Sequence, residues 1–417
     1  MYQSIEECRI CGSKKLTKYF HLGMMPLANS YVDPKSKDNE FGFPLEVLFC
    51  ENCSLSQLSI VVDPVVMFSN YAYHSSISKT FQKHCADMAE QVKGYLKKPN
   101  LFVVDIASND GCMLREYKKK GFRVLGVEPA KNLAEMANAE GIETLPYFWD
   151  EVVAKKILQK YGAPDVITAT NVFAHVHDVK SFVQNVKLIL ADEGVFIIEC
   201  PYALNLIKKN EFDTIYHEHL SYFLVKPLLH LFEQEGMELA DVQEMPIHGG
   251  TIRVFVTKKE NKGLANQKAR IADFLEREQK EGLHSIQSYF NFVNQLLDLK
   301  IDLLQLLSKI KKEHKSIAAY GASAKGNTML NYCGVSSDFI DFIIDETPEK
   351  QNKLYPGNHI PIFGYAELEK RKPDYLVILA WNFAKEIMDK TKEHEKRGGK
   401  YIVPIPKVRV ISGVNDL

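Results

Sequence analysis

The sequence lacks any long hydrophobic run and carries almost no net charge. No uninterrupted apolar stretch approaches the roughly 20 residues that span a bilayer. The start, MYQSIEECRI, lacks the basic and then apolar layout of a signal peptide. The formal net charge of −1 offers no general attraction for nucleic acid or for an anionic membrane. We therefore expect a cytoplasmic protein that binds neither nucleic acid nor a membrane.

Short-period repeats and low-complexity segments are missing as well, and what remains is the composition of a globular protein. Hydrophobic residues make up 46% and charged residues 25% of the 417 residues. A chain of this length exceeds one ordinary core, which predicts two or three domains. The sequence leaves the oligomeric state open, a monomer included.

Strand and helix signals alternate through the middle of the chain. LFVVDIA, FRVLGVE, PDVITAT and GVFIIEC are typical of strands, and helical segments such as VKSFVQNVKLILA separate them. This order predicts a parallel sheet covered on both faces, with MELADVQEMP and GTIRVFVTKK as antiparallel strands at its edge. Helix formers dominate residues 264–314, and KSIAAYGASAKGNTMLNYCG then begins a second strand-turn-helix unit.

The eight cysteines are expected to be thiols or metal ligands, because the cytoplasm is reducing. Four of them form two C-x2-C pairs, CRIC with Cys8 and Cys11 and CENC with Cys50 and Cys53. Two such pairs can place four thiolates around one Zn²⁺, which leaves no position for water and predicts a structural metal. The alternatives are two unrelated surface pairs, redox pairs and a nucleic-acid-binding zinc module, and the neutral charge does not favour the last of these. Isolated core thiols are expected at Cys85, Cys112, Cys200 and Cys333.

A polar turn follows the first strand of the central region. In VVDIASNDGCML, Asp105 ends the strand and Gly111 precedes a predicted helix, so the backbone can approach a ligand while a carboxylate binds its polar head. Glu128 ends the next strand, where a carboxylate can accept both hydroxyls of a ribose. Because no G-x-G-x-x-G motif is present, S-adenosylmethionine (SAM) fits better than a dinucleotide. The alternative is a tight turn that binds nothing.

The predicted cofactor contacts gather at the carboxyl edge of the sheet, and they are Asp105, Ala107, Ser108, Asn109, Gly111, Glu128 and Asn171. Asn171 and His175, in TATNVFAHVHDV, follow another predicted strand and are placed to face the reactive end of the cofactor. A structural histidine explains His175 equally well.

Seven motifs in order resemble the sugar C-methyltransferases that build branched deoxysugars on nucleotide carriers. They are the paired cysteines, YAYHSSISKT, DIASNDG, NVFAHVHDV, YHEHLSYF, HGGTIRVF and GASAKGNTML. The resemblance implies an α/β protein with a zinc-binding domain over 1–75 and a Rossmann-like SAM-dependent methyltransferase domain over 76–262. A helical connector and a second Rossmann-like domain over 263–417 would help to hold the nucleotide sugar.

The family's substrate is a 4-keto-6-deoxy nucleotide sugar, whose C4 carbonyl acidifies the C3 proton. Forming a carbon–carbon bond there needs a base, donors to the enolate oxygen and an aligned methyl group. Tyr216, Glu218 and His219 match the family's active-site motif, and His219 is the expected base. Glu218 would orient an imidazole or bind a sugar hydroxyl. The expected enolate donors are His175 and either Tyr71 or Tyr73, while His217 is expected to face away and Tyr222 and Phe223 to be packing residues.

The turn YGASAKGNTML departs from the ATP-binding pattern G-x4-G-K-[ST], because Lys325 precedes a glycine. A helix amino terminus with Ser323 and Lys325 can still receive a sugar-nucleotide pyrophosphate, and we expect Ser323, Lys325 and Asn327 to bind substrate. The alternative is a vestigial Rossmann turn. In HGGTIR, His248 and Arg253 either face the substrate or belong to a turn that enters a strand.

The predicted function is thus SAM-dependent methylation of C3 of a nucleotide-linked 4-keto-deoxysugar through an enolate. The nucleotide base (dTDP, GDP or CDP) and the C3 substituent are not identified by the sequence. One alternative is an O- or N-methyltransferase of a sugar or small metabolite. A second is a zinc-containing binding module with a degenerate methyltransferase fold.

Overall fold

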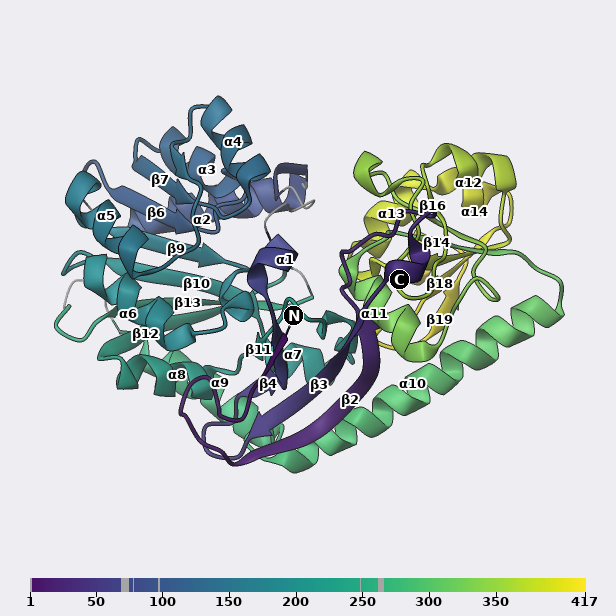
Figure 1. The fold of residues 1–417 in the computed structure, drawn as a ribbon, viewed down its shortest axis with the longest axis horizontal. Coiled ribbons are helices and arrows are strands. Elements are labelled where there is room, and N and C mark those ends of the chain that lie inside the picture. The colour runs from purple at the N-terminus through teal and green to yellow at the C-terminus, as the bar shows by residue number, and fades with distance from the viewer. Residues whose placement is uncertain (1, 69–74, 78, 97, 248, 262–265) are drawn as a thin grey trace.

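The fold was obtained as a computed structural model that describes residues 2–68, 75–77, 79–96, 98–247, 249–261 and 266–417. Two α/β lobes lie side by side, joined by the long helix α10 (Ile286–Lys312) and by a ribbon of two strands near the amino terminus (Figure 1). In the described part of the chain no helix is long and apolar enough to cross a membrane.

The central lobe is built on a seven-stranded sheet in the described part of the chain. Its order is β12 (Met237–Met245), β13 (Thr251–Lys258), β10 (Val195–Pro201), β9 (Val166–Thr170), β6 (Phe102–Ile106), β7 (Arg123–Val127) and β8 (Thr144–Leu145). The predicted parallel core β10-β9-β6-β7 is confirmed, as is the antiparallel pairing of β13 with β10 and β12. Every residue of β6 is buried, as expected of a strand covered on both faces.

Helices cover both faces of this sheet. They are α2 (Lys79–Tyr95), α3 (Cys112–Lys119), α4 (Lys131–Ala139), α5 (Glu151–Tyr161), α6 (Val179–Ile189), α7 (Ala203–Lys208) and α8 (Val225–Gln234). In α2 the buried residues recur every three or four positions, including Phe81, Cys85, Met88 and Val92, which turns one stripe of the helix toward the sheet. The predicted cofactor turn lies between β6 and α3.

The carboxyl-terminal lobe repeats this architecture on a smaller scale. Its sheet has the order β16 (Ile362–Phe363), β15 (Phe342–Ile344), β14 (Ile317–Tyr320), β17 (Tyr375–Ile378), β18 (Lys400–Val403) and β19 (Arg409–Ile411). All neighbours are parallel except β18 and β19. The helices of this lobe are α11 (Ala324–Cys333), α12 (Ala366–Arg371), α13 (Ala384–Lys390) and α14 (Lys392–Lys396). The predicted second Rossmann-like domain is confirmed.

The amino-terminal region contains more strand than its sequence suggested. β2 (Leu16–Pro26) and β3 (Gly42–Cys50) form a long antiparallel ribbon, and β4 (Ser56–Leu58) extends it. The fourth strand of this sheet is β11 (Ser221–Tyr222), which comes from the YHEHLSYF motif. β1 (Tyr2–Ser4) pairs separately with β5 (Ile60–Val62), and the short helix α1 (Pro64–Phe68) follows.

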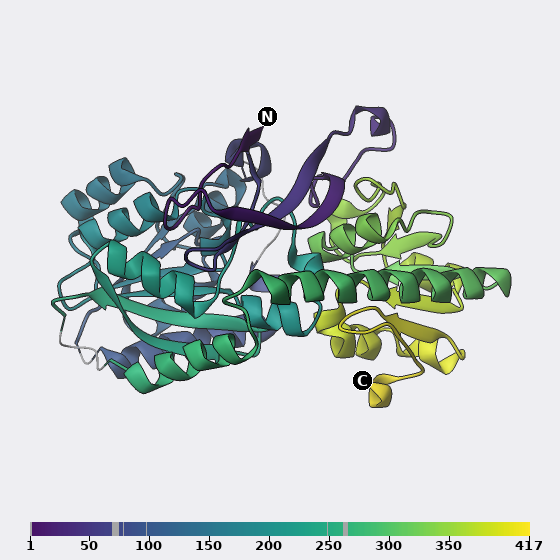
Figure 2. The same cartoon turned by 90° about the horizontal axis from the view of Figure 1, so that it is seen from below.

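The connector predicted from helix formers consists of α9 (Lys268–Lys280) and α10. One face of α10 packs along the ribbon, where Tyr289 lies 4.9 Å from Tyr19 and Phe292 lies 6.4 Å from Phe20 between ring centroids. From below, the ribbon is seen beside α10 (Figure 2). The ribbon and helix therefore form one brace between the two lobes.

Candidate active site

The four predicted zinc ligands come together. Their sulfur atoms all lie within 4.8 Å of one another, with Cys8 3.5 Å from Cys53 and Cys11 3.5 Å from Cys50. A tetrahedron with Zn–S bonds of about 2.3 Å has S–S edges of about 3.8 Å, so the cluster fits Zn²⁺ closely. The prediction that these four cysteines form one zinc-binding cluster is confirmed.

The chemistry of the cluster also calls for a cation. The neighbouring thiol of Cys50 is the largest of several causes that raise the pKa of Cys8 to about 12. The same crowding raises the pKa of Cys53, chiefly through Cys50. Four neighbouring thiols cannot all ionise beside one another, whereas a bound divalent cation stabilises all four as thiolates.

Arg9 joins this zinc module to the YHEHLSYF motif. Its side chain is buried, and Nη1 donates to the carbonyl oxygen of Leu220 at 2.9 Å and to that of Leu58 at 3.2 Å. The backbone N–H of Leu220 donates to the carbonyl of Ala174, next to His175. The motif is thus held between the module and the turn that carries His175.

The predicted cofactor turn over 105–111 has left-handed backbone at alternate positions. φ is 55° at Ala107, 53° at Asn109 and 80° at Gly111, a region that disfavours residues with a Cβ atom. Asparagine tolerates it, glycine occupies it freely, and alanine is strained there. A Cβ on Gly111 would lie 3.3 Å from Ile142 Cγ2, so the chain is close there as well. Held strain of this kind is typical of ligand-binding turns.

The two carboxylates predicted to bind SAM lie at the ends of β6 and β7. Glu128 is buried and accepts the backbone N–H of Asn109 at 2.8 Å and that of Ala130 at 2.8 Å. Burial raises the pKa of Glu128. Asp105 accepts the hydroxyl of Thr168, and burial raises its pKa to about 7. Fixed carboxylates beside a strained turn are a suitable cradle for the ribose and amino acid parts of SAM.

Two other predicted cofactor residues are placed differently. Ser108 Oγ lies beneath β7, where a Cβ on Gly126 would come within 2.5 Å of it, so this hydroxyl points toward the sheet. Asn171 follows β9 with a φ of 57° and donates its backbone N–H to the carbonyl of Glu199. Nearby, Thr170 Oγ1 is buried without a hydrogen-bond partner among the described residues, which leaves a polar atom available to a ligand.

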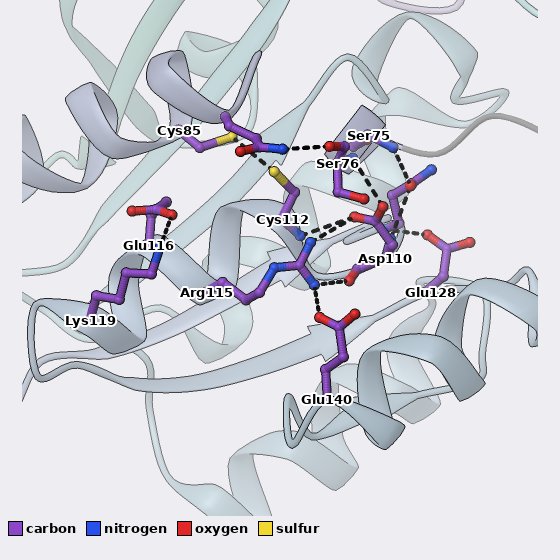
Figure 3. Close-up of polar contacts among 12 residues, drawn as sticks. Ser75, Ser76, Cys85, Asp110, Cys112, Arg115, Glu116, Lys119, Glu128 and Glu140 are labelled. Atoms are coloured by element: carbon purple, nitrogen blue, oxygen red, sulfur yellow. Dashed lines mark hydrogen bonds and ion pairs between the residues drawn. The ribbon is translucent and has the colours of Figure 1, made fainter. Parts of the chain in front are cut away.

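Sequence reasoning missed Asp110, which ties the predicted cofactor turn to the segment before α2. Its Oδ2 accepts the N–H of Ser76 at 3.0 Å, while the side chain of Asn109 accepts the N–H of Ser75 at 2.9 Å. Figure 3 shows these contacts, with Arg115 bonded to Asp110 and to Glu140. Asp110 was visible in the sequence only as a polar turn residue. Tyr71 and Tyr73 lie outside the described residues.

Glu128→Ala is expected to weaken SAM binding about tenfold or more, because loss of a charged hydrogen-bonding partner costs roughly 1.5–3 kcal/mol. Titration calorimetry measures the Kd. Glu135→Ala, at an exposed position on α4, is the matched control and should bind SAM normally. Zinc content should not change in either variant. An unaltered Kd in Glu128→Ala would show that this carboxylate does not hold the cofactor.

The YHEH motif lies on a turn, with the N–H of His219 donated to the carbonyl of Tyr216. His219 Nδ1 lies 2.7 Å from the carbonyl oxygen of Thr214. Because a carbonyl only accepts, Nδ1 carries the proton and Nε2 of the neutral ring is basic. The hydroxyl of Tyr216 donates to this Nε2 at 3.1 Å. The turn therefore presents an oriented imidazole base.

Of the two neighbouring histidines, His175 lies beside His219, and His217 packs against the amino-terminal module. The ring of His175 lies 4.8 Å from that of His219, at 84°, and burial lowers the pKa of His175 to about 4. His175 is therefore neutral near pH 7 and retains one N–H donor. His217 turns away, as predicted: its Nε2 donates to the carbonyl of Pro44, and its ring packs on Phe43.

Glu218 is buried and contacts the amino-terminal module. Its Oε1 accepts a hydrogen bond from Asn29 Nδ2 at 2.6 Å. Glu218 and His217 thus both contact the amino-terminal module, through different residues of it. Tyr222 and Phe223 are buried, as expected of packing residues, and Phe223 lies against Phe173.

The predicted substrate loop lies beside the motif, but its residues differ in role. Ser323 caps α11 by accepting the N–H of Gly326 at 3.1 Å. Lys325 Nζ is buried, forms no hydrogen bond among the described residues, and lies 5.1 Å from the ring centroid of Trp381. Asn327 is 1% exposed and donates to the carbonyl of Pro356, which disagrees with a substrate contact. Its side-chain amide forms a hydrogen bond within the carboxyl-terminal lobe.

The carboxyl-terminal lobe is joined through Trp381 to Asp213, which lies just before the motif. Trp381 Nε1 donates to Asp213 Oδ2 at 2.6 Å, and the ring of Phe212 lies 5.1 Å from that of Tyr332. A cleft of 1030 Å³ opens near this junction, lined by Gly249, Gly250 and Trp381 among others. This contact between distant segments carries no signal in the sequence.

Arg253 does not face this cleft as predicted for a substrate contact. It is 2% exposed on β13, and its Nε donates to Glu199 Oε1 at 2.6 Å. His84 Nε2 lies 2.8 Å from the other oxygen of Glu199. This placement disagrees with substrate binding, because the guanidinium neutralises a buried carboxylate. His248 lies outside the described residues.

Three family models match the chain in succession. A zinc binding domain covers residues 8–68, a methyltransferase domain 79–242, and a C-methyltransferase C-terminal domain 246–406. The C-methyltransferase NovU of Streptomyces niveus is 36% identical over 417 residues, which is 99% of this chain and 98% of NovU.

Solved structures show partial likeness. Magnesium protoporphyrin IX methyltransferase from Synechocystis PCC 6803, with bound SAM, is 9% identical, with 43% of this chain and 79% of that chain covered and a TM-score of 0.33. The plantazolicin methyltransferase BpumL, in complex with SAH, is 12% identical. The match covers 42% of this chain and 84% of that chain, with a TM-score of 0.34. Identity to NovU over nearly the whole chain, with the three models in order, places this protein in the family of zinc-containing, SAM-dependent C-methyltransferases.

Proposed function

We propose that the protein methylates the carbon next to the keto group of a nucleotide-linked 4-keto-6-deoxysugar, with C3 as the expected position. The observation that carries the proposal is the contact of His219 Nδ1 with the carbonyl oxygen of Thr214, from which it follows that Nδ1 carries the proton and Nε2 is the basic nitrogen. An oriented base is required to remove a proton from carbon, whereas methylation of an alcohol or amine does not require an acidified carbon.

The neighbours of His219 suit the enolate that forms. His175 stays neutral and retains an N–H, so it can donate to the developing oxyanion without adding a full positive charge. Tyr216 stabilises the orientation of the base through its hydroxyl. The methyl group comes from SAM at the adjoining turn. These residues therefore supply a base and a donor in contact with one another.

The nucleotide is proposed to lie between the lobes, toward Ser323 and Lys325. Lys325 offers a buried cationic donor without a hydrogen-bond partner among the described residues, and Ser323 stands at the amino terminus of α11. A pyrophosphate can accept hydrogen bonds from the lysine and from the helix end. Thermal shift with dTDP-, GDP- and CDP-linked 4-keto sugars identifies the nucleotide as the one that raises the melting temperature most.

Deuterium exchange tests the reaction itself. Incubated in deuterated water with the 4-keto sugar nucleotide and without SAM, the protein should wash deuterium into the carbon that is later methylated. NMR distinguishes C3 from C5, the two carbons that flank the ketone. An O- or N-methyltransferase would show no wash-in. A degenerate methyltransferase fold would give no heat when titrated with SAM.

A further inference from the structure

The segment after β2 enters the active-site region from the zinc module. Asn29 Nδ2 donates to Glu218 Oε1 at 2.6 Å, and two residues later the hydroxyl of Tyr31 donates to the carbonyl of Ala322 at 2.6 Å. Glu218 belongs to the catalytic turn, while Ala322 stands next to the α11 cap. One short segment of the zinc module thus touches both walls of the proposed site.

Asn29 is suited to fix the direction of a buried carboxylate. Glu218 is 5% exposed, and a carboxylate removed from water needs strong donors. The amide of Asn29 lies 2.6 Å from one oxygen of Glu218, which is a short and directional hydrogen bond. The oxygen that Asn29 holds is therefore fixed relative to the turn that carries His219.

Asn29 is itself held from the carboxyl-terminal lobe. The ring of Tyr31 is stacked on that of Tyr355, 6.4 Å apart and at 16°, and Val32 pairs with Leu354. Lys350 Nζ donates to the same Ala322 carbonyl at 2.9 Å. These contacts leave the segment little freedom to move without one of the lobes. The position of Asn29 therefore depends on both lobes being in place.

We propose that Asn29 is a positioning residue for methyl transfer and that it acts through Glu218. The zinc module then has a task beyond stability, because it delivers one polar side chain to a site formed by the other two domains. The proposal rests on the proposed function in one respect, which is that Glu218 faces the substrate.

A double-mutant cycle tests this role with Asn29→Ala, Glu218→Ala and the double variant. Asn29→Ala should lower kcat about 10- to 100-fold, as a small misplacement of a reacting group does. The Kd for SAM and the zinc content should not change. In the Glu218→Ala background the same substitution should cost little more, because its target is gone. Ser30→Ala, at the exposed neighbouring position, is the matched control and should keep full activity.

Equal losses in both backgrounds would overturn the proposal, and so would an equal loss in Ser30→Ala. If Asn29→Ala does not fold, a double variant with Asn29→Asp and Glu218→Gln replaces it. In that variant residue 218 donates the hydrogen bond and residue 29 accepts it. Recovery of kcat relative to Asn29→Asp alone supports positioning, and no recovery contradicts it.

The wild-type rate with a 4-keto sugar nucleotide tests the proposed function separately. Should the wild type be inactive, that function fails, and the unfolding free energies of the four cycle proteins still test the contact. Additive unfolding effects would then overturn the role of Asn29, whereas coupling would sustain the link between Asn29 and Glu218.

Discussion

Replacing His219 with asparagine is expected to lower the turnover number roughly 10²- to 10⁴-fold, the usual scale for a positioned general base. Asparagine keeps a side chain of similar reach and can still donate to Thr214, but it has no basic nitrogen in place of Nε2. Deuterium exchange and methylation should therefore fall together. The affinities for SAM and for the sugar nucleotide should change little, because the lost interaction belongs to the transition state.

His217→Asn is the matched control for this experiment. His217 lies two residues away and is buried against the amino-terminal ribbon, so its replacement should lower stability and leave exchange intact. If methylation falls in His219→Asn while exchange survives, another group takes the proton, with His175 or Tyr216 as the candidates. If both activities persist near their original rates, the base assignment is wrong.

Removal of the metal is expected to have the largest effect on stability. Metal-binding free energies of structural zinc sites are on the order of 10 kcal/mol, and this energy is folding energy. Cys50→Ser should therefore lower the melting temperature by about 10 °C or more and lower solubility. Stability should fall before the methylation rate is specifically affected. Arg9 nevertheless links the zinc module to the YHEHLSYF motif through its hydrogen bond to Leu220, so a loosened module can disturb the motif.

Metal analysis should find about one Zn²⁺ per chain in the wild type and less in Cys50→Ser. Cys333→Ala, at a buried thiol of α11, should keep full zinc and cost only the small stability of a truncated core side chain. Folded, active protein without zinc would disprove the assignment. Equal destabilisation by Cys333→Ala would show that burial, and not metal binding, explains the effect of Cys50.

The features predicted best from sequence are those that depend on local sequence patterns. β6, β7, β9 and β10 are continuous apolar runs, and the paired cysteines carry their geometry in their spacing. The turn at 105–111 was recognisable because Gly111 and Asn109 are residue types that accept left-handed backbone. In each case a few residues close together in the sequence determine the local structure, so it can be predicted without knowing the tertiary fold.

The features that sequence missed depend on contacts between distant residues. Asn327 and Arg253 have side chains suited to ligands, but their hydrogen-bonding groups face Pro356 and Glu199 inside the protein. Asn29 has the same chemistry as Asn327 and reaches Glu218 instead. Residue type cannot distinguish these outcomes, because each is decided by which distant segment packs alongside.

The pairing of β4 with β11 has a consequence for synthesis on the ribosome. The amino-terminal strands emerge first, yet β4 finds its outer partner only when Ser221 and Tyr222 have been made, and the ribbon finds α10 later still. Until then the nascent chain exposes an unpaired strand edge and the aromatic face of the ribbon, both of which invite association. Chaperone capture during translation, and failure of a truncated amino-terminal fragment to stay in solution, are the expected results.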